Sequence, residues 1–160
     1  MACASDGDAG PSESTPWCPS ARPEQAGALI FGVRTAGEAG ARIGYLSEVV
    51  PVTPAVLDLA EPVSPLEVFR FAAPCAESGC AHFADRKCGL VSRIVERVPV
   101  VVSIAPPCAV RSKCRWWAQE GVAACRRCPQ IVTSESGLNK AVAEAAVPSV
   151  AEMEREPESG

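Results

Sequence analysis

The chain has 160 residues and a formal net charge of −4, and its 48% of hydrophobic residues allows a core. The length fits one domain, or one domain with tails. Large apolar side chains are scarce, with four Phe, three Trp, one Tyr and two Met. A core this small commonly needs disulfides or a metal to stabilise it, so composition argues against a fold that rests on apolar packing alone.

Charge is distributed unevenly along the chain. Residues 1–74 carry 4 basic and 9 acidic groups, residues 75–140 carry 10 and 5, and residues 141–160 carry 1 and 5. A basic middle segment therefore lies between two acidic ends. An acidic tail beside a basic domain can mask the domain or tune its choice of partner, although both can also be ordinary solvated surfaces.

Three regions are predicted from composition: a disordered acidic arm over residues 1–27, a cysteine-rich domain over 28–147 and a disordered acidic tail over 148–160. The N-terminus lacks a basic segment followed by an apolar one, so we expect no secretion signal and a cytoplasmic protein. The longest apolar run, Val98 to Ala105, is too short to span a bilayer, and no membrane partner is expected.

Two strands and two short helices are predicted in the first half of the domain. The residues 28–33 and 43–50 each resemble a strand, and the segment between them resembles a turn, so a hairpin is predicted. Thr53-Pro54 and Ser64-Pro65 each place a capping side chain before a proline at the first helical position, which predicts two short helices.

The second half is predicted to be mostly helical. Asp85 to Val98 has an apolar face and is expected to form the longest helix, followed by a buried strand over Val100–Ile104. A helix over Ser112–Glu120 ending at Gly121 and a last helix over Ser136–Val147 complete the prediction. The fold class is therefore a small α+β domain.

Seven of the nine cysteines and the only histidine fall between Cys75 and Pro129. Cysteines in a chain that is not exported are expected to stay reduced, and clusters of them indicate metal ligands or redox groups. Cys3 and Cys18 lie in the predicted arm and are left out of the metal sites. The remaining eight residues divide into two sets of four possible ligands: Cys75, Cys80, His82 and Cys88, then Cys108, Cys114, Cys125 and Cys128.

Thiolates suit zinc and iron–sulfur clusters. The second set ends in Cys-x2-Cys-Pro, and a proline after a ligand cysteine also ends bacterial ferredoxin motifs. Its irregular spacing favours an iron–sulfur cluster, of the 4Fe-4S kind, over zinc. Zinc in either set, or iron in one and zinc in the other, remains open, as does a chain without native metal. His82 can equally be an ordinary hydrogen-bonded residue, and buried cysteines also pack well as small apolar side chains.

Basic and aromatic residues alternate around the second set. Such a surface could contact phosphates and stack bases, so a zinc-stabilised nucleic-acid-binding module is the alternative function. The arginines can instead offset thiolate charge, and at least one of the adjacent tryptophans can shield a cluster. The residues concerned are Arg111, Lys113, Arg115, Trp116, Trp117, Arg126 and Arg127.

Enzyme signatures are missing from the sequence. It contains no Ser-His-Asp set, no glycine-rich phosphate loop and no carboxylate-rich metal site. Cys125 and Cys128 could form a dithiol redox pair, but Pro129 fits poorly in the helix that such a pair requires. We therefore expect a non-catalytic metal or cluster protein rather than an enzyme.

From Phe31 to Thr133 the chain resembles a group of bacterial cysteine-rich proteins, some labelled "nitrogen fixation protein". The resemblance rests on the two ligand sets and on Trp116 and Trp117. It implies iron–sulfur or electron-transfer work beside a larger enzyme. The predicted function is an iron–sulfur protein that acts in electron transfer, redox sensing or cluster-dependent assembly, with a protein redox partner.

Overall fold

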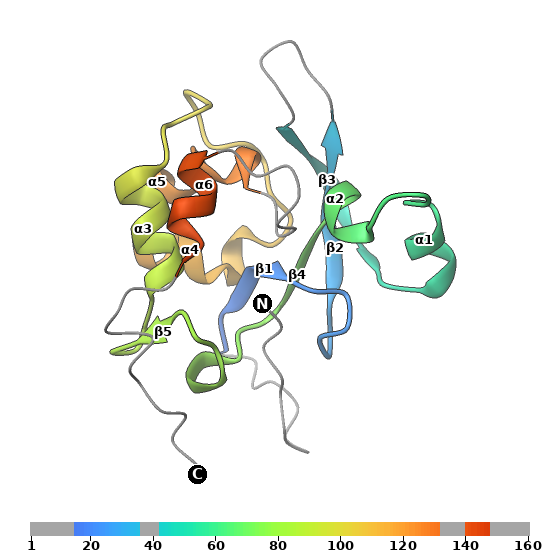
Figure 1. The fold of residues 1–160 in the computed structure, drawn as a ribbon, viewed down its shortest axis with the longest axis horizontal. Helices are drawn as coiled ribbons and strands as arrows, with labels where there is room; N and C mark the ends of the chain where they lie inside the picture. Colours follow the sequence, from blue (N-terminus) through green and yellow to red (C-terminus); the bar gives the residue numbers. More distant parts are fainter. Residues whose placement is uncertain (1–14, 36–41, 132–139, 148–160) are drawn as a thin grey trace.

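The computed structural model describes residues 15–35, 42–131 and 140–147. Within them the chain forms a four-stranded antiparallel sheet, a two-stranded ribbon and a group of short helices, so the predicted α+β class is confirmed. The helices of the cysteine-rich half lie on one side of the large sheet, and the short helices α1 and α2 lie on the other (Figure 1).

The large sheet has the strand order β1-β4-β2-β3, with every neighbouring pair antiparallel. The predicted hairpin is its β2–β3 pair. Alternating side chains of the central strands cover opposite faces, as the period of two in a strand requires: Ile30 and Phe71 pack with α1 and α2, whereas Phe31 and Ala72 pack with Val110. The strands are β1 (Trp17–Ala21), β2 (Leu29–Thr35), β3 (Arg42–Pro51) and β4 (Phe69–Pro74).

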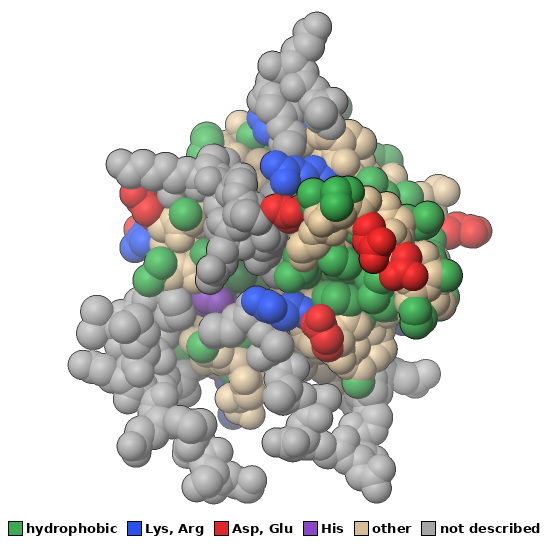
Figure 2. Space-filling view, turned by 45° about the vertical axis from the view of Figure 1, so that its right-hand side comes forward, with side chains coloured by type: hydrophobic (Ala, Val, Ile, Leu, Met, Phe, Trp, Pro, Cys, Tyr) green, Lys and Arg blue, Asp and Glu red, His purple; other side chains and the backbone are tan. Residues whose placement is uncertain are grey.

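The two short helices form where the proline signals predict them, as α1 (Pro54–Asp58) and α2 (Pro65–Val68). Thr53 accepts a hydrogen bond from the Val56 amide, and Ser64 accepts one from the Leu66 amide. On the face where α1 comes forward, acidic side chains are interspersed with apolar ones (Figure 2).

The N-terminal strand β1 corrects the predicted boundary of the disordered arm. Residues 17–21 pair with β4, and Pro19 and Ala21 are fully buried. Small residues and prolines fill this strand, so its composition resembles that of a disordered segment although its backbone completes a sheet. Residues 1–14 of the predicted arm and the predicted tail over 148–160 lie outside the described residues.

The cysteine-rich half consists of short pieces rather than long elements. After β4 the chain makes a small ribbon and then a series of short helices (Figure 1). In order they are η1 (Glu77–Gly79), β5 (Phe83–Ala84), β6 (Lys87–Cys88), α3 (Gly89–Arg97), η2 (Arg111–Lys113), α4 (Arg115–Glu120), α5 (Val122–Cys125), η3 (Cys128–Gln130) and α6 (Lys140–Ala145).

Two predictions in this half are wrong in extent or kind. The helix expected from Asp85 begins only at Gly89, because Asp85 and Arg86 have φ values of 50° and 62° and turn the β5–β6 ribbon. The segment Val100–Ile104 is not a strand. It lies at the surface, with Ile104 79% exposed, and its backbone bonds to Arg126 instead of to a sheet.

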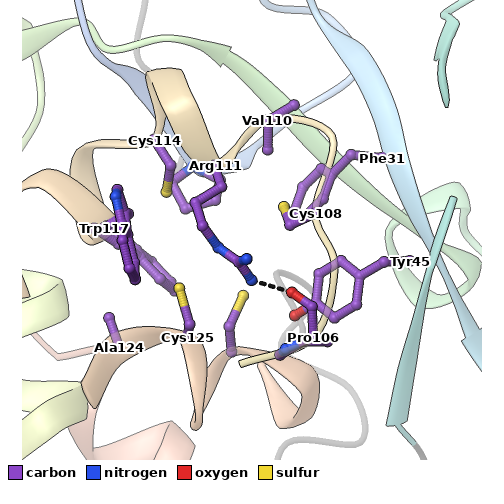
Figure 3. Close-up of a pocket in the computed structure, with 13 residues that line it drawn as sticks. Phe31, Tyr45, Pro106, Cys108, Val110, Arg111, Cys114, Trp117, Ala124 and Cys125 are labelled. Atoms are coloured by element: carbon purple, nitrogen blue, oxygen red, sulfur yellow. Dashed lines mark hydrogen bonds between the residues drawn. The ribbon is translucent and has the colours of Figure 1, made fainter. Parts of the chain in front are cut away.

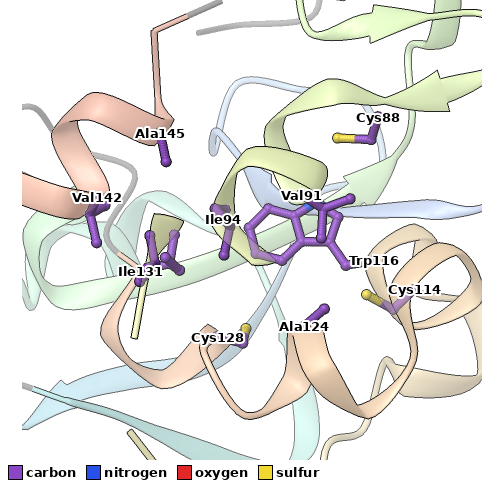
Figure 4. Close-up of a cluster of buried hydrophobic side chains, with 11 residues drawn as sticks. Cys88, Val91, Ile94, Cys114, Trp116, Ala124, Cys128, Ile131, Val142 and Ala145 are labelled. Atoms are coloured by element: carbon purple, nitrogen blue, oxygen red, sulfur yellow. The ribbon is translucent and has the colours of Figure 1, made fainter. Parts of the chain in front are cut away.

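Trp116 is the centre of the largest apolar cluster of the described residues. It is 2% exposed and packs among α3, α5, η3 and α6 (Figure 4). Three cysteines belong to the same cluster, so the core and the candidate ligands share their side chains. The cluster contains Cys88, Val91, Ile94, Val98, Cys114, Trp116, Ala124, Cys128, Ile131, Val142 and Ala145.

Gly121 ends α4, as predicted, and begins α5. Its φ of 62° and ψ of −143° lie in a region that is nearly restricted to glycine. The turn directs α5 back along α4, so that Cys114 before α4 and Cys125 at the end of α5 come to one cavity.

We expect Gly121→Ala to destabilise the protein by about 1–3 kcal/mol, since a Cβ strains this backbone although no atom within 4 Å obstructs it. Urea unfolding monitored by circular dichroism measures the change. Gly44→Ala is the matched control, because its Cβ meets only ordinary contacts at 3.6 Å. Equal stability of the two variants would contradict this account of the turn.

Candidate metal centres

Four cysteines line one cavity, here called cavity A. They are the second predicted set, Cys108, Cys114, Cys125 and Cys128, and they come from the loop before η2, the start of α4, the end of α5 and the start of η3. The cavity encloses about 360 Å³ including its open mouth. Figure 3 shows the sulfurs of Cys108, Cys114 and Cys125 directed toward the same space.

The wall of cavity A is largely apolar. It includes Phe31 and Tyr45 from the sheet and Trp116 and Trp117 from α4. Arg111 is the charged exception: its guanidinium points among the sulfurs and donates to the Pro106 carbonyl (Figure 3). A hydrogen bond from Arg111 lowers the pKa of Cys125, which partly offsets the raising effect of burial.

A second cavity, here called cavity B, gathers the whole first set. It is lined by Cys75, Cys80, His82 and Cys88, and it encloses about 510 Å³ including its mouth. Cys18, which is outside the metal sites predicted from the sequence, also lines this cavity. Strand β1 places Cys18 at the cavity. The composition of residues 1–27 predicts disorder, so this strand was not expected from the sequence.

Backbone pairing positions the ligands of cavity B. Cys18 of β1 is the register partner of Ala73, and the Cys75 amide, directly after β4, donates to the Pro16 carbonyl at 2.8 Å. Cys18 and Cys75 are therefore held near each other. Gln119 of α4 fixes Cys88 from both sides: its Oε1 accepts from the Cys88 amide at 2.8 Å and its Nε2 donates to the Cys88 carbonyl at 2.9 Å.

His82 is buried at the edge of cavity B, and Arg93 lies 2.7 Å from its Nδ1. A guanidinium only donates, so Nδ1 must be the accepting nitrogen and the neutral ring carries its proton on Nε2. Arg93 is itself held by the Ala145 carbonyl at 2.8 Å. In this arrangement neither ring nitrogen has a lone pair available for a metal.

Burial and the charges of other cysteines in the same cavity raise the pKa of five thiols. Burial is the largest cause in each case, and it raises the pKa of Cys18, Cys88, Cys108 and Cys125 and brings that of Cys114 to about 12. Repulsion adds to it: Cys75, Cys80 and Cys88 act on Cys18, whereas Cys108 and Cys128 act on Cys114.

Four thiols line each of the two cavities. Among residues 15–35, 42–131 and 140–147, however, no group of three or more His, Cys, Asp or Glu side chains is arranged to hold a metal ion.

Of the six buried side-chain atoms that lack a hydrogen-bond partner among the described residues, four are donors in the walls of the two cavities. They are the Tyr45 hydroxyl and the Nε atom of Arg111 at cavity A, Arg115 Nε at cavity B, and Trp116 Nε1 in the wall between them. Such groups are costly unless an acceptor meets them. An acceptor-rich ligand in each cavity would satisfy them.

Arg70 of β4 lies beneath cavity A and is 1% exposed. Its Nε donates to the Pro19 carbonyl at 2.7 Å, and its Nη1 donates to the carbonyls of Cys128 and Ile131 at 3.1 and 2.9 Å. Within the part of the chain that the structure describes it makes no ion pair with a carboxylate. A buried charge of this kind requires negative charge nearby, which ionised thiolates of cavity A would supply.

Much of the predicted basic and aromatic surface is paired within the molecule. Arg111 stacks on Trp117 and Lys113 lies over Trp17, with separations of 5.4 and 5.7 Å from the ring centroids. Arg115 lies 5.1 Å from the Phe83 centroid and makes a 3.1 Å ion pair with Glu77. Trp116 is the buried member of the tryptophan pair, and Trp117 is 38% exposed.

Comparisons with protein-family models, with curated proteins and with solved structures gave no match to this chain. Across the described ranges, none of the helices has the length and apolar character needed to cross a bilayer. The cysteine-lined cavities A and B are therefore the features that bear on function.

We expect the metal-free, reduced protein to lose stability as pH rises from about 9 toward about 12. Burial raises the pKa of Cys114 from 9.0 to about 12 in the folded protein, so the folded state holds this proton more tightly than the unfolded chain does. The stability that results is fully present below pH 9.0 and is lost as the pH rises toward about 12. Urea unfolding across this range measures the slope. Cys114→Ala should make the slope shallower, because the other buried thiols still contribute to it, and a wild-type profile that matches the variant would refute the prediction.

We expect Arg70→Met to destabilise the protein by about 2–4 kcal/mol, since it leaves three buried carbonyls without their donor. Thermal and urea unfolding measure the loss. Arg34→Met is the control on the neighbouring strand, where the half-buried side chain should tolerate the change within about 0.5 kcal/mol. A loss at Arg70 no larger than at Arg34 would exclude this role.

Proposed function

We propose that the chain is an iron–sulfur protein whose cavity A binds a polynuclear cluster, of the 4Fe-4S kind, through Cys108, Cys114, Cys125 and Cys128. One observation carries the proposal: four thiols from separate segments of the chain line a single, largely apolar cavity. Four thiolates around a polynuclear core are the usual ligand set of such clusters.

The unpartnered donors favour a cluster over zinc. A zinc ion offers no acceptor beyond its own thiolates, whereas the sulfides of a cluster accept hydrogen bonds. The Tyr45 hydroxyl is buried in the wall of cavity A and has no hydrogen-bond partner among the described residues. Burial is the main cause that raises the pKa of this hydroxyl, and the charge of the nearby Cys128 raises it further. Bound sulfide or thiolate would provide the acceptor that this hydroxyl needs.

A cluster would also stabilise the cysteine-rich half. The four ligands join η2, α4, α5 and η3, none of which exceeds six residues. Helices this short are unstable alone in water. Bonds from one inorganic core to all four segments would hold them together, and Arg111, which stacks on Trp117 in the wall of the cavity, would lie beside the bound thiolates.

Four protein thiolates fill the ligand positions of such a cluster, so no open site remains for a substrate. This supports electron transfer or redox sensing rather than catalysis. Trp117, 38% exposed beside cavity A, offers a contact surface for a protein redox partner. No disulfide joins any of the eight described cysteines, which fits a reducing compartment such as the cytoplasm.

We expect protein purified without oxygen to contain iron and acid-labile sulfide in equal amounts and to absorb broadly in the visible range, through charge transfer from sulfur to iron. Cys108→Ser should remove the contribution of cavity A. Ala109→Ser is the matched control, because it adds a hydroxyl at the exposed neighbouring position. Zinc as the only metal, at one or two ions per chain, would refute the proposal.

A further inference from the structure

We infer that cavity B binds a second cluster, ligated by Cys18, Cys75, Cys80 and Cys88, with His82 outside the ligand set. The inference rests on the proposed function for the kind of cluster and on separate residues for its site. In forming this centre a preformed 4Fe-4S cluster in its 2+ state, delivered by a carrier that holds it through thiolates, exchanges those thiolates for the four cysteines of the cavity. Four iron–sulfur bonds to the carrier break as four to the chain form, the protons of the cysteine thiols pass to the released carrier thiolates, and the iron keeps its oxidation state.

Cys18 is part of cavity B on three grounds. Its side chain lines the cavity together with the three cysteines of the first set. Its strand holds it against the β4 strand that leads to Cys75. The charges of Cys75, Cys80 and Cys88 all act on its thiol, and among the effects resolved none comes from a cysteine of cavity A.

His82 has a different role in the same cavity. Arg93 donates to Nδ1 and thereby leaves the proton on Nε2, so the ring is a hydrogen-bond donor toward the cavity side chains rather than a ligand. The backbone of His82 is also engaged, since its carbonyl accepts from the Gly89 amide at 2.6 Å. This contact holds the start of α3 beside Cys88. His82 is thus a positioning residue for the ligand loop.

The surroundings of cavity B match those of cavity A. Arg115 lines the cavity, and its buried Nε has no partner among the described residues. Trp116 belongs to the walls of both cavities. Figure 4 shows its indole between Cys88 on one side and Cys114 and Cys128 on the other. The two centres would therefore lie on opposite sides of one buried ring.

The test compares the iron and sulfide content of four variants purified without oxygen. Cys18→Ser and Cys75→Ser should each halve the content of the wild type, and Cys114→Ser should halve it through the other cavity. His82→Asn should keep the full content, because the asparagine oxygen can still accept from Arg93 while the Nε2 position is lost. Electron paramagnetic resonance of the reduced proteins should show that Cys18→Ser and Cys75→Ser lack one cluster signal, and that Cys114→Ser lacks the other.

Two results would overturn the inference while leaving the proposed function intact. One is full content in Cys18→Ser with half content in His82→Asn, which would make His82 the fourth ligand. The other is a wild type whose entire content disappears in Cys114→Ser, which would leave cavity B without a cluster. Absence of iron from every protein would instead refute the proposed function, and this inference with it.

A measurement on the wild-type chain covers the case in which Cys18→Ser does not fold. Loaded protein and protein stripped of iron by a chelator are alkylated under the same native conditions, and the modified peptides are identified by mass spectrometry. Cys18 should react at least tenfold more slowly in the loaded protein. Equal rates in the two samples, with Cys75 protected by loading, would exclude Cys18 as a ligand.

Discussion

The fold depends on one buried guanidinium. Arg70 is on a central strand of the sheet, and its three hydrogen bonds reach β1 through Pro19 and the segment from Cys128 to Ile131. Its charge also lies 5.4 Å from the centre of the Trp116 ring and 5.6 Å from that of Phe31. This side chain thus adds polar links to the apolar packing of Phe31 and Ala72 against Val110, and together they join the sheet to the cysteine-rich half, whose own helices are too short to be stable separately.

The position of that charge connects stability with the proposed chemistry. Desolvating a guanidinium is costly, and hydrogen bonds to carbonyls offset only part of the cost. A cluster with four thiolates carries net negative charge, so it would compensate Arg70 without any carboxylate in the core. Buried positive charge also favours the more reduced, more negative state of a cluster, and it raises the reduction potential of a centre beside it.

The sequence predicted the local features and missed some of the long-range ones. Capping residues such as Thr53 and Ser64, the β2–β3 hairpin and the stop at Gly121 are encoded by neighbours in the chain, so they were recognised. The grouping of the eight ligand candidates into two cavities also follows their order in the chain. Cys18 was missed because its place depends on pairing with β4, more than fifty residues away, and the contact of His82 with Arg93 leaves no signal in the spacing of cysteines.

Trp116 lies between the two proposed centres. Its indole is shared by both cavity walls and is almost completely shielded from solvent, while Trp117 beside it reaches the surface at cavity A. Two redox centres on either side of a buried aromatic ring would exchange electrons over a short path through a medium of low dielectric. Only cavity A adjoins the exposed tryptophan, so a partner that docks there would reach cavity B through the first centre. Cavity A would then hold the first centre that an electron from the partner reaches, and cavity B would hold the second.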